Sequence, residues 1–221
     1  MISHAVEDYL KAMYELEEDF GAVTTSLLAV HLDVAPASVT GMVQKLAKAK
    51  PRLVNYERHR GVTLTPAGRK IALEVIRHHR LIELYLAESL GYEWDRVDAE
   101  AEKLEHVISE EFEDKIAALL GDPTTDPHGD PIPSKDGAVA APSRLALSEV
   151  PAGQTVRVTR VRDDDPAFLR YLKELGIGLQ VALTIAERAP FDGPLHILVA
   201  QAGAVHALGR AVTDKIFVEP A

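Results

Sequence analysis

The segment TSLLAVHLDVAPASVTGMVQKL, residues 25–46, predicts two short helices joined by a turn. Apolar residues recur every three or four positions on both sides of Asp33-Val34-Ala35, and this is the spacing of one helix face. Pro36 follows the turn, and proline is favoured in the first turn of a helix. The segment therefore predicts a helix-turn-helix.

The flanking sequence extends this motif. A helix is predicted upstream over about residues 3–18, with Ser3 as its N-cap and Gly21 after its end. Downstream, the runs 53–56 and 62–64 are apolar or β-branched, and Gly61 between them favours a tight hairpin. Three helices followed by a hairpin predict a winged helix-turn-helix domain over residues 1–72.

The second helix of the motif and the hairpin tip carry residue types that contact DNA. Serine, threonine and glutamine can reach base edges, whereas basic residues bind phosphates without reading sequence. The alternative is that these polar residues belong to an ordinary solvated surface. We predict DNA contacts by Ser38, Thr40, Gln44, Lys45, Arg58, His59 and Arg60.

The rest of the chain divides into a helical part, a linker and a β-rich part. Residues 73–125 are predicted to be helical, because a long helix starts at Thr65-Pro66 and ends at Gly91, and two more cover about 95–107 and 109–120. Residues 126–149 are proline-rich and predict a linker. Residues 150–221 contain short strand-like runs and one helix, which fits a small β-barrel. The predicted fold class is mainly α with a small β part.

Charge is distributed unevenly along the 221 residues. The net charge of −10 argues against a protein that binds nucleic acid over its whole surface. Ten lysines and arginines and two acids lie between Lys45 and Arg80, whereas twelve acids and three bases lie between Gly91 and Asp126. A basic region followed by an acidic one fits a DNA contact beside a cation site.

Two absences limit the function classes. The sequence has no cysteine, which excludes disulfides, thiolate zinc sites and thiol catalysis. It also has no apolar run long enough for a membrane helix and no secretory signal at its start. We therefore expect a cytoplasmic protein with no membrane partner.

Carboxylates and imidazoles recur at helix spacing in the acidic region. The sequence Glu102-x-x-Glu105-His106 follows Asp98 by four residues, and residues three and four apart share one face of a helix. Oxygen and nitrogen ligands without sulfur suit Mn²⁺ or Fe²⁺. The segment therefore predicts a cation site.

A second segment, His79-x-x-x-Glu83, presents the same ligand types one helical turn apart. Asp8, on the first predicted helix, offers a further carboxylate. The alternative is that each pair is a water-exposed or capping group, and either pair alone would favour that interpretation. Ligands from separate helices together favour a metal site.

The chain resembles the metal-dependent repressors of the diphtheria toxin repressor family, in particular their manganese-responsive branch. The matching stretches are EDYL at 7–10, YEL at 14–16, SVT at 38–40, MVQKL at 42–46, RGVTLT at 60–65, HRLIE at 79–83, EH at 105–106 and PHGDPIP at 127–133. The C-terminal barrel resembles the SH3-like (FeoA-like) third domain of the family.

This resemblance implies a homodimer with a binuclear or paired cation site. It implies ligands for the first cation at Asp8, Glu102, Glu105 and His106. It implies ligands for the second at His79, Glu83 and Asp98. Lys11 departs from the pattern, because manganese regulators have a glutamate ligand there, and Asp164 is the nearest counterpart of the ligands that iron-type members take from the barrel.

The resemblance implies a DNA-binding transcriptional repressor that controls metal-ion homeostasis. Mn²⁺, or alternatively Fe²⁺, would act as the corepressor that stabilises the homodimer on a palindromic operator in double-stranded DNA. No enzymatic activity is expected. Two alternatives remain open: a winged-helix regulator without metal control, and a binuclear metallohydrolase, for which the sequence shows no nucleophile motif, HExxH or phosphate loop.

Overall fold

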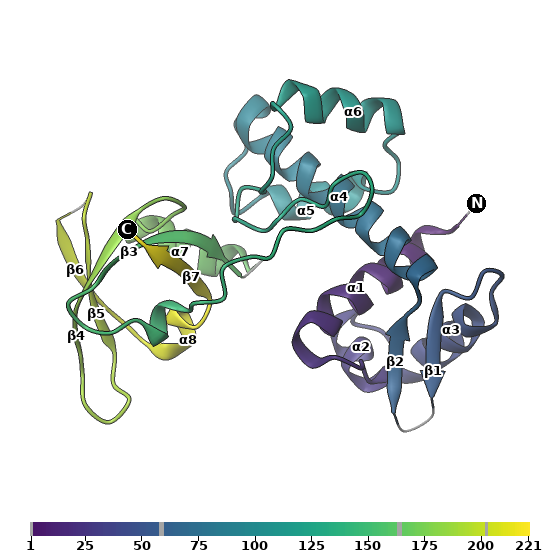
Figure 1. The fold of residues 1–221 in the computed structure, drawn as a ribbon, viewed down its shortest axis with the longest axis horizontal. Coiled ribbons are helices and arrows are strands. Elements are labelled where there is room, and N and C mark those ends of the chain that lie inside the picture. Colours follow the sequence, from purple (N-terminus) through teal and green to yellow (C-terminus); the bar gives the residue numbers. More distant parts are fainter. Residues whose placement is uncertain (1, 58–59, 163–164, 202) are drawn as a thin grey trace. The chain divides into compact units, whose positions relative to one another are not determined.

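The structure is a computed structural model that describes residues 2–57, 60–162, 165–201 and 203–221, apart from the side chain of Asp19 (Figure 1). The chain forms two compact units. The first contains residues 1–79, 105–108 and 133–138, and the second contains residues 80–104, 109–132 and 139–221. The predicted mainly α fold class with a small C-terminal β part is confirmed.

The first unit contains the predicted winged helix-turn-helix. Its helices are α1 (His4–Phe20), α2 (Thr25–His31) and α3 (Pro36–Lys48), followed by strands β1 (Val54–Glu57) and β2 (Gly61–Leu64). The antiparallel strands pair Val54 with Leu64 and Glu57 with Gly61. The Thr24 hydroxyl caps α2 by accepting a hydrogen bond from the Leu27 amide at 3.1 Å.

Gly61 is required by the geometry of the hairpin. Its φ is +99°, and a Cβ there would lie 2.8 Å from the carbonyl oxygen of Val23. Val23 pairs with Val62, so the segment before α2 joins the hairpin as a third extended segment. The hairpin is thus fixed against the helices instead of projecting as an isolated ribbon.

An apolar core holds the helices of this unit together. Leu10 and Met13 on α1, Leu28 on α2 and Val43 and Leu46 on α3 are almost completely buried. Each such side chain stabilises the fold by about 1.5–3 kcal/mol relative to an exposed position. The helices therefore pack through one apolar face each, and their polar faces remain available.

The long helix α4 (Pro66–Leu90) runs from the first unit into the second. The Thr65 hydroxyl caps it by accepting a hydrogen bond from the Gly68 amide at 3.2 Å. The second unit adds α5 (Val97–Leu104) and α6 (Glu110–Leu119), and Ser109 caps α6 through the Phe112 amide. Leu81, Leu84 and Ile116 pack together with Ile132 in an apolar cluster.

Helix α5 ends at Leu104, three residues before the predicted end at Val107. Residues 105–107 form a turn instead. The Nδ1 atom of His78 donates a hydrogen bond to the carbonyl oxygen of Glu105 at 3.0 Å. This side-chain contact replaces a helical partner for that carbonyl, so the turn is held in place.

The C-terminal residues form a five-stranded antiparallel sheet in the order β6-β5-β4-β3-β7, seen in green and yellow in Figure 1. The strands are β3 (Thr155–Val161), β4 (Ala182–Arg188), β5 (Leu195–Val199), β6 (Ala204–Leu208) and β7 (Ile216–Pro220). A 3-10 turn at Leu147–Glu149 precedes the sheet, and helices α7 (Pro166–Glu174) and α8 (Arg210–Thr213) lie between strands. Register shifts in β3 and β4 bend the sheet around a core that includes Val158, Leu183 and Ile197.

The segment predicted as a linker is hydrogen-bonded at its start. The Oδ1 atom of Asp126 accepts hydrogen bonds from the amides of His128 (2.8 Å) and Asp130 (3.0 Å), and Ile132 is buried. The predicted domain boundaries stay predictions. Among the described residues no single helix is long and apolar enough to cross a membrane; α2 and α3 reach that length and composition only as a pair bent by 115°.

Candidate metal centre

Three predicted ligands converge in the first unit. The Nε2 atom of His106 lies 2.7 Å from Oδ1 of Asp8 and 3.4 Å from Oε1 of Glu105. One ligand atom from each residue lies within 4.8 Å of the other two. Asp8 comes from α1, whereas the other two belong to the turn after α5, so residues nearly 100 positions apart in sequence meet here. We call this group the Asp8–Glu105–His106 centre.

The centre fits a divalent cation by its chemistry. Glu105 is 1% exposed, and its Oε1 atom is buried and accepts no hydrogen bond from the residues that the structure describes. Leaving a buried charged oxygen unsatisfied costs more than the about 1–3 kcal/mol of a neutral group. Two carboxylate oxygens and one imidazole nitrogen are ligands that Mn²⁺ and Fe²⁺ accept. A cation bound here would satisfy this oxygen.

Glu7, which the sequence did not reveal as part of the site, orients His106. The Nδ1 atom of His106 lies 2.7 Å from Oε2 of Glu7. A carboxylate accepts hydrogen bonds, so Nδ1 can donate a proton to Glu7. With a cation at the centre, Nε2 would bind the cation through its lone pair while Nδ1 keeps this hydrogen bond, the arrangement typical of metal-binding histidines. The His4 ring stacks on the His106 ring with centroids 4.8 Å apart.

The second oxygen of Glu105 binds a lysine. Its Oε2 atom accepts a hydrogen bond from Lys11 Nζ at 2.7 Å and lies 2.5 Å from Nδ1 of His79. Burial raises the pKa of Glu105, but the hydrogen bond from His79 and the charge of Lys11 outweigh burial, so that its pKa lies below the usual value. The structure therefore favours an ionised Glu105, the form that binds a cation.

The other predicted ligands are distributed over both units. His79 belongs to the first unit, whereas Glu83, Asp98 and Glu102 belong to the second. Their grouping with one another or with the centre therefore stays a prediction. Asp164 lies outside the described residues.

In the second unit, Glu83 lies in a buried ionic cluster. Its Oε1 atom lies 3.5 Å from Nδ1 of His128, whose Nε2 donates to the carbonyl oxygen of Trp94 at 2.8 Å. Asp126 lies 3.5 Å from Arg80 in the same cluster. Ligand atoms of Glu83, Asp126 and His128 lie within 4.8 Å of one another, but both nitrogens of His128 already have protein partners. The geometry therefore favours an ion-pair network at this place.

The cluster changes the protonation of its members. Burial opposes the charged form of His128, but the hydrogen bond to Glu83 and the negative charges nearby outweigh burial and raise its pKa to about 9. Burial, together with the charges of Glu83 and Asp130, raises the pKa of Asp126 to about 7. At neutral pH His128 is therefore charged and paired with Glu83.

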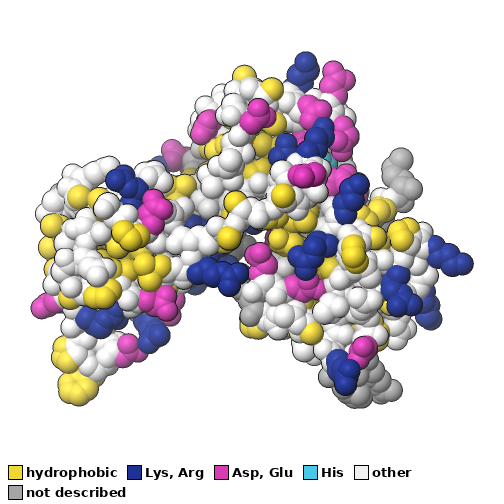
Figure 2. Space-filling model, viewed as in Figure 1, with side chains coloured by type: hydrophobic (Ala, Val, Ile, Leu, Met, Phe, Trp, Pro, Cys, Tyr) yellow, Lys and Arg dark blue, Asp and Glu magenta, His cyan; other side chains and the backbone are white. Residues whose placement is uncertain are grey.

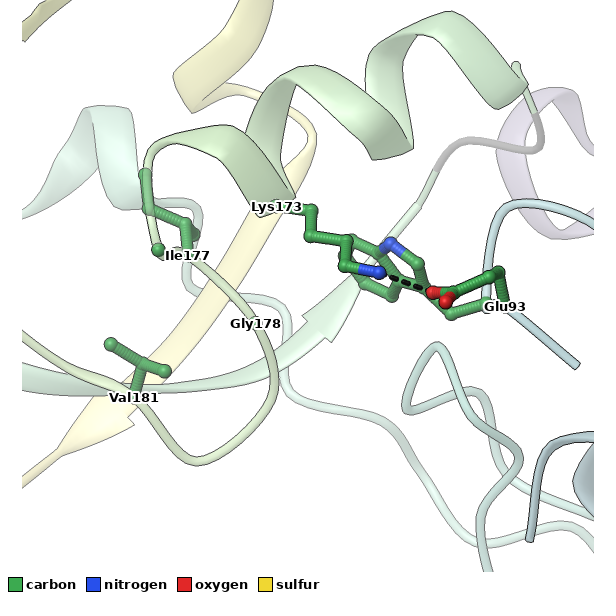
Figure 3. A pocket seen from close by; sticks show the side chains of 7 residues that line it. Glu93, Lys173, Ile177, Gly178 and Val181 are labelled. Atoms are coloured by element: carbon green, nitrogen blue, oxygen red, sulfur yellow. Dashed lines mark hydrogen bonds and ion pairs between the residues drawn. The ribbon is translucent and has the colours of Figure 1, made fainter. Parts of the chain in front are cut away.

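The second unit also contains a cavity of about 360 Å³. In Figure 3 the Lys173 ammonium and the Glu93 carboxylate form an ion pair across it, and Ile177 and Val181 contribute apolar side chains. The Trp94 ring, which lines the cavity, stacks on His128 with centroids 5.8 Å apart. The cavity therefore adjoins the ionic cluster of the second unit.

Helix α3, which the sequence predicts to contact DNA, presents a polar face. Ser38, Gln44 and Lys45 are exposed, whereas Val39 and Val43 on the opposite face are buried. This division leaves the polar side chains accessible to a DNA groove. Figure 2 shows Lys and Arg side chains around the part of the first unit that holds α3 and the hairpin.

Two predicted DNA contacts have protein partners. The Thr40 hydroxyl donates a hydrogen bond to the carbonyl oxygen of Pro36 at 3.0 Å, and it retains acceptor capacity. Arg60 is exposed and pairs with Glu57 at 3.1 Å. Arg58 and His59 lie outside the described residues. All DNA contacts stay predictions.

Family models match the chain in three consecutive parts. Residues 1–62 match the iron dependent repressor N-terminal DNA binding domain, residues 65–134 the iron dependent repressor metal binding and dimerisation domain, and residues 145–220 the FeoA domain. These three parts follow the order of domains expected from the sequence.

Similar proteins match along most of the chain. The iron-dependent repressor IdeR of Mycobacterium tuberculosis (strain H37Rv) is 34% identical over 200 residues, which cover 85% of each chain. The IdeR of Mycobacterium leprae is 32% identical over 204 residues, or 87% of each chain. Among solved structures, a manganese-dependent transcriptional repressor in complex with manganese is 38% identical, covers 98% of this chain and 100% of its own, and has a TM-score of 0.89. The zinc-bound structure of ScaR is 31% identical, covers 98% and 99%, and has a TM-score of 0.81.

These matches cover the helices, the hairpin and the β-rich part described above. As its sequence motifs predicted, the chain belongs to the iron-dependent repressor family of metal-dependent transcriptional regulators, which is also called the diphtheria toxin repressor family.

Proposed function

We propose that this repressor responds to Mn²⁺, binds it at the Asp8–Glu105–His106 centre, and recognises a palindromic operator as a homodimer. The observation that carries the proposal is the buried Oε1 atom of Glu105, which faces His106 Nε2 at 3.4 Å and accepts no hydrogen bond from the described residues. A hard cation is the partner that this set of oxygen and nitrogen ligands would accept.

Manganese is favoured over iron by the ligand set of the centre. Asp8 supplies a carboxylate, and the chain has no cysteine, so no soft thiolate takes part. The similar mycobacterial proteins are named iron-dependent, whereas one similar solved structure is named as a complex with manganese. Glu102, His79, Glu83, Asp98 and Asp164 are further candidate ligands from the predicted set.

The proposed mechanism depends on where Asp8 lies. It is carried by α1, which packs on α2 and on β2 through its apolar face. Without a cation, the carboxylates of Asp8 and Glu105 repel each other. A bound cation supplies the positive charge that neutralises both groups. Asp8 would then hold α1 against the turn that bears Glu105 and His106.

This attachment would stabilise one conformer of the DNA-binding domain, here taken as residues 1–72. If a homodimer uses that conformer to place two copies of α3 in successive major grooves, cation and DNA favour the same state. Their coupling is then reciprocal, and about 1–3 kcal/mol would suffice for a useful switch. Ser38, Thr40, Gln44 and Lys45 are the proposed groove contacts, with Arg58, His59 and Arg60 on phosphates.

A mobility-shift titration tests the proposal. The protein is titrated onto a candidate palindrome in Mn²⁺, Fe²⁺ (without oxygen), Zn²⁺ or EDTA. We expect retention in Mn²⁺ at lower concentrations than in Fe²⁺, and loss of retention in EDTA. Asp8→Ala should abolish the Mn²⁺ response, whereas Glu18→Ala, which removes an exposed carboxylate from the same helix, should leave it unchanged.

The outcomes separate the alternatives. Equal retention in EDTA and Mn²⁺ would support a winged-helix regulator without metal control and would refute the proposal. Mn²⁺-dependent hydrolysis of phosphoesters without DNA retention would support a metallohydrolase.

A further inference from the structure

Lys11 occupies a position at the centre that a cation could take. Its Nζ atom lies 2.7 Å from Oε2 of Glu105 and 3.1 Å from Nδ1 of His79. The Lys11 side chain is 12% exposed and the Glu105 side chain is 0% exposed. The ammonium group is therefore largely removed from water, paired with a carboxylate oxygen and placed beside an imidazole nitrogen.

Lys11 lies beside two atoms of ligand type that already contact each other. Oε2 of Glu105 and Nδ1 of His79 lie 2.5 Å apart and share a hydrogen bond. The Lys11 ammonium donates a hydrogen bond to Oε2 and lies within 3.1 Å of Nδ1. A carboxylate oxygen and an imidazole nitrogen are also the atoms that bind a divalent cation. The ammonium group thus uses the ligand atoms that a second cation would need.

Glu105 places the two positions side by side. Its Oε1 atom faces Asp8 and His106, and its Oε2 atom faces Lys11. A carboxylate with one oxygen toward each position is the bridging ligand that two adjacent cations share. In this chain one of the two positions is filled by a covalently attached positive charge.

We propose that the Lys11 ammonium replaces a second cation at this centre, so that one divalent cation completes it. This inference rests on the proposed cation at the Asp8–Glu105–His106 centre. Lys11 also connects α1 to the turn of Glu105 without metal, since it lies on the helix that carries Asp8. One of the two links between α1 and this turn is therefore permanent, and the other depends on the cation.

The test is the number of Mn²⁺ ions bound by the full-length protein, counted by equilibrium dialysis and elemental analysis. Lys11→Glu removes the ammonium and adds a carboxylate beside His79. We expect this variant to bind one more Mn²⁺ per chain than the unaltered protein. Electron paramagnetic resonance should then show two magnetically coupled Mn²⁺ ions in the variant, and an uncoupled spectrum for the ion at the centre of the unaltered protein.

Lys70→Glu is the matched control. It makes the same change of charge at an exposed position of α4, and it should leave both the count and the spectrum unchanged. Thermal unfolding in EDTA shows whether each variant is folded before its count is used. If Lys11→Glu does not fold, Lys11→Asp, which adds a shorter carboxylate, is counted in its place, with the same expectation of one additional Mn²⁺ and the same refuting results.

Three results would overturn the inference. The first is an unchanged count in folded Lys11→Glu. The second is an additional ion in Lys70→Glu, because the gain would then reflect overall charge. The third is a coupled pair of Mn²⁺ ions in the unaltered protein. Absence of any bound Mn²⁺ in the unaltered protein would instead refute the proposed function, so the two failures are distinguishable.

Discussion

Removal of the Glu7 side chain should weaken Mn²⁺ binding even though Glu7 is not a proposed ligand. Oε2 of Glu7 lies 2.7 Å from Nδ1 of His106, and a hydrogen bond here orients the ring so that Nε2 faces Asp8 and Glu105. Loss of such a supporting group typically costs about 10–100-fold in metal affinity. The magnitude for this chain depends on how well the bond is shielded from water.

The structure places the effect at the lower end of that range. A hydrogen bond to a charged group contributes about 1.5–3 kcal/mol when shielded. The Glu7 side chain is 21% exposed and the His106 side chain 9%, so the bond is partly hydrated. We expect about 1.4 kcal/mol, or tenfold weaker binding, for Glu7→Ala. Glu7→Gln retains a hydrogen-bond acceptor without the charge, so its Mn²⁺ affinity should lie between those of the unaltered protein and Glu7→Ala.

The assay is competition for Mn²⁺ between the protein and a fluorescent chelator at low salt. Glu18→Ala removes an exposed carboxylate from the same helix and controls for the loss of charge. The expected order of affinity is unaltered protein, Glu7→Gln, Glu7→Ala. If Glu7→Ala binds Mn²⁺ within twofold of the Glu18→Ala control, then Glu7 does not orient His106 and the reasoning is refuted.

Three further predictions concern stability and DNA. The pKa of His128 is raised from 6.5 to about 9, which contributes up to about 3 kcal/mol of stability below pH 6.5. This contribution is lost as the pH rises through 9. In EDTA, the difference in unfolding free energy between the unaltered protein and His128→Gln, measured by denaturant titration, should therefore shrink between pH 6.5 and pH 9. A difference that does not change with pH would contradict this pairing. Gly61→Ala should destabilise the protein by about 1–3 kcal/mol in thermal unfolding, and by more than Gly21→Ala, because Gly21 has a positive φ but a Cβ added there would meet no atom within 4 Å; equal losses would show that the contact with Val23 is unimportant. In mobility-shift assays, Gln44→Ala should weaken binding to the operator by about 1–3 kcal/mol and binding to unrelated DNA by little. An equal loss of binding free energy on both DNAs would indicate that Gln44 contacts the phosphate backbone and not a base.

The fold could be predicted from the sequence because local signals agree with one another. Pro36 begins α3, Gly91 follows the end of α4, and the Thr65-Pro66 pair begins the same helix, as predicted. The early end of α5 could not be predicted in this way. It depends on His78, whose contact with the Glu105 carbonyl is a tertiary interaction and leaves no periodic signal in either segment.

The centre could be predicted in part. Asp8, Glu105 and His106 have the side chains of cation ligands and do converge, whereas Glu7 is not evident from ligand types alone and Lys11 stands out only as a departure from a pattern. Helix spacing contains a signal for both residues. His4, Glu7, Asp8 and Lys11 recur at intervals of three and four, and all four contact His106 or Glu105. A polar stripe of this kind on the first helix indicates that its polar face meets a partner inside the protein.

The two faces of α1 differ in what they contact. Its apolar face, with Leu10 and Met13, packs into the core, whereas the polar stripe of His4, Glu7, Asp8 and Lys11 meets Glu105 and His106. Natural variation could therefore retune which ion a repressor senses by exchanging residues on one side of a single 17-residue helix. The same division would let protein engineers alter ion preference for use in biosensors, since exchanges on this face of α1 leave α3, the helix proposed to contact the operator, unchanged.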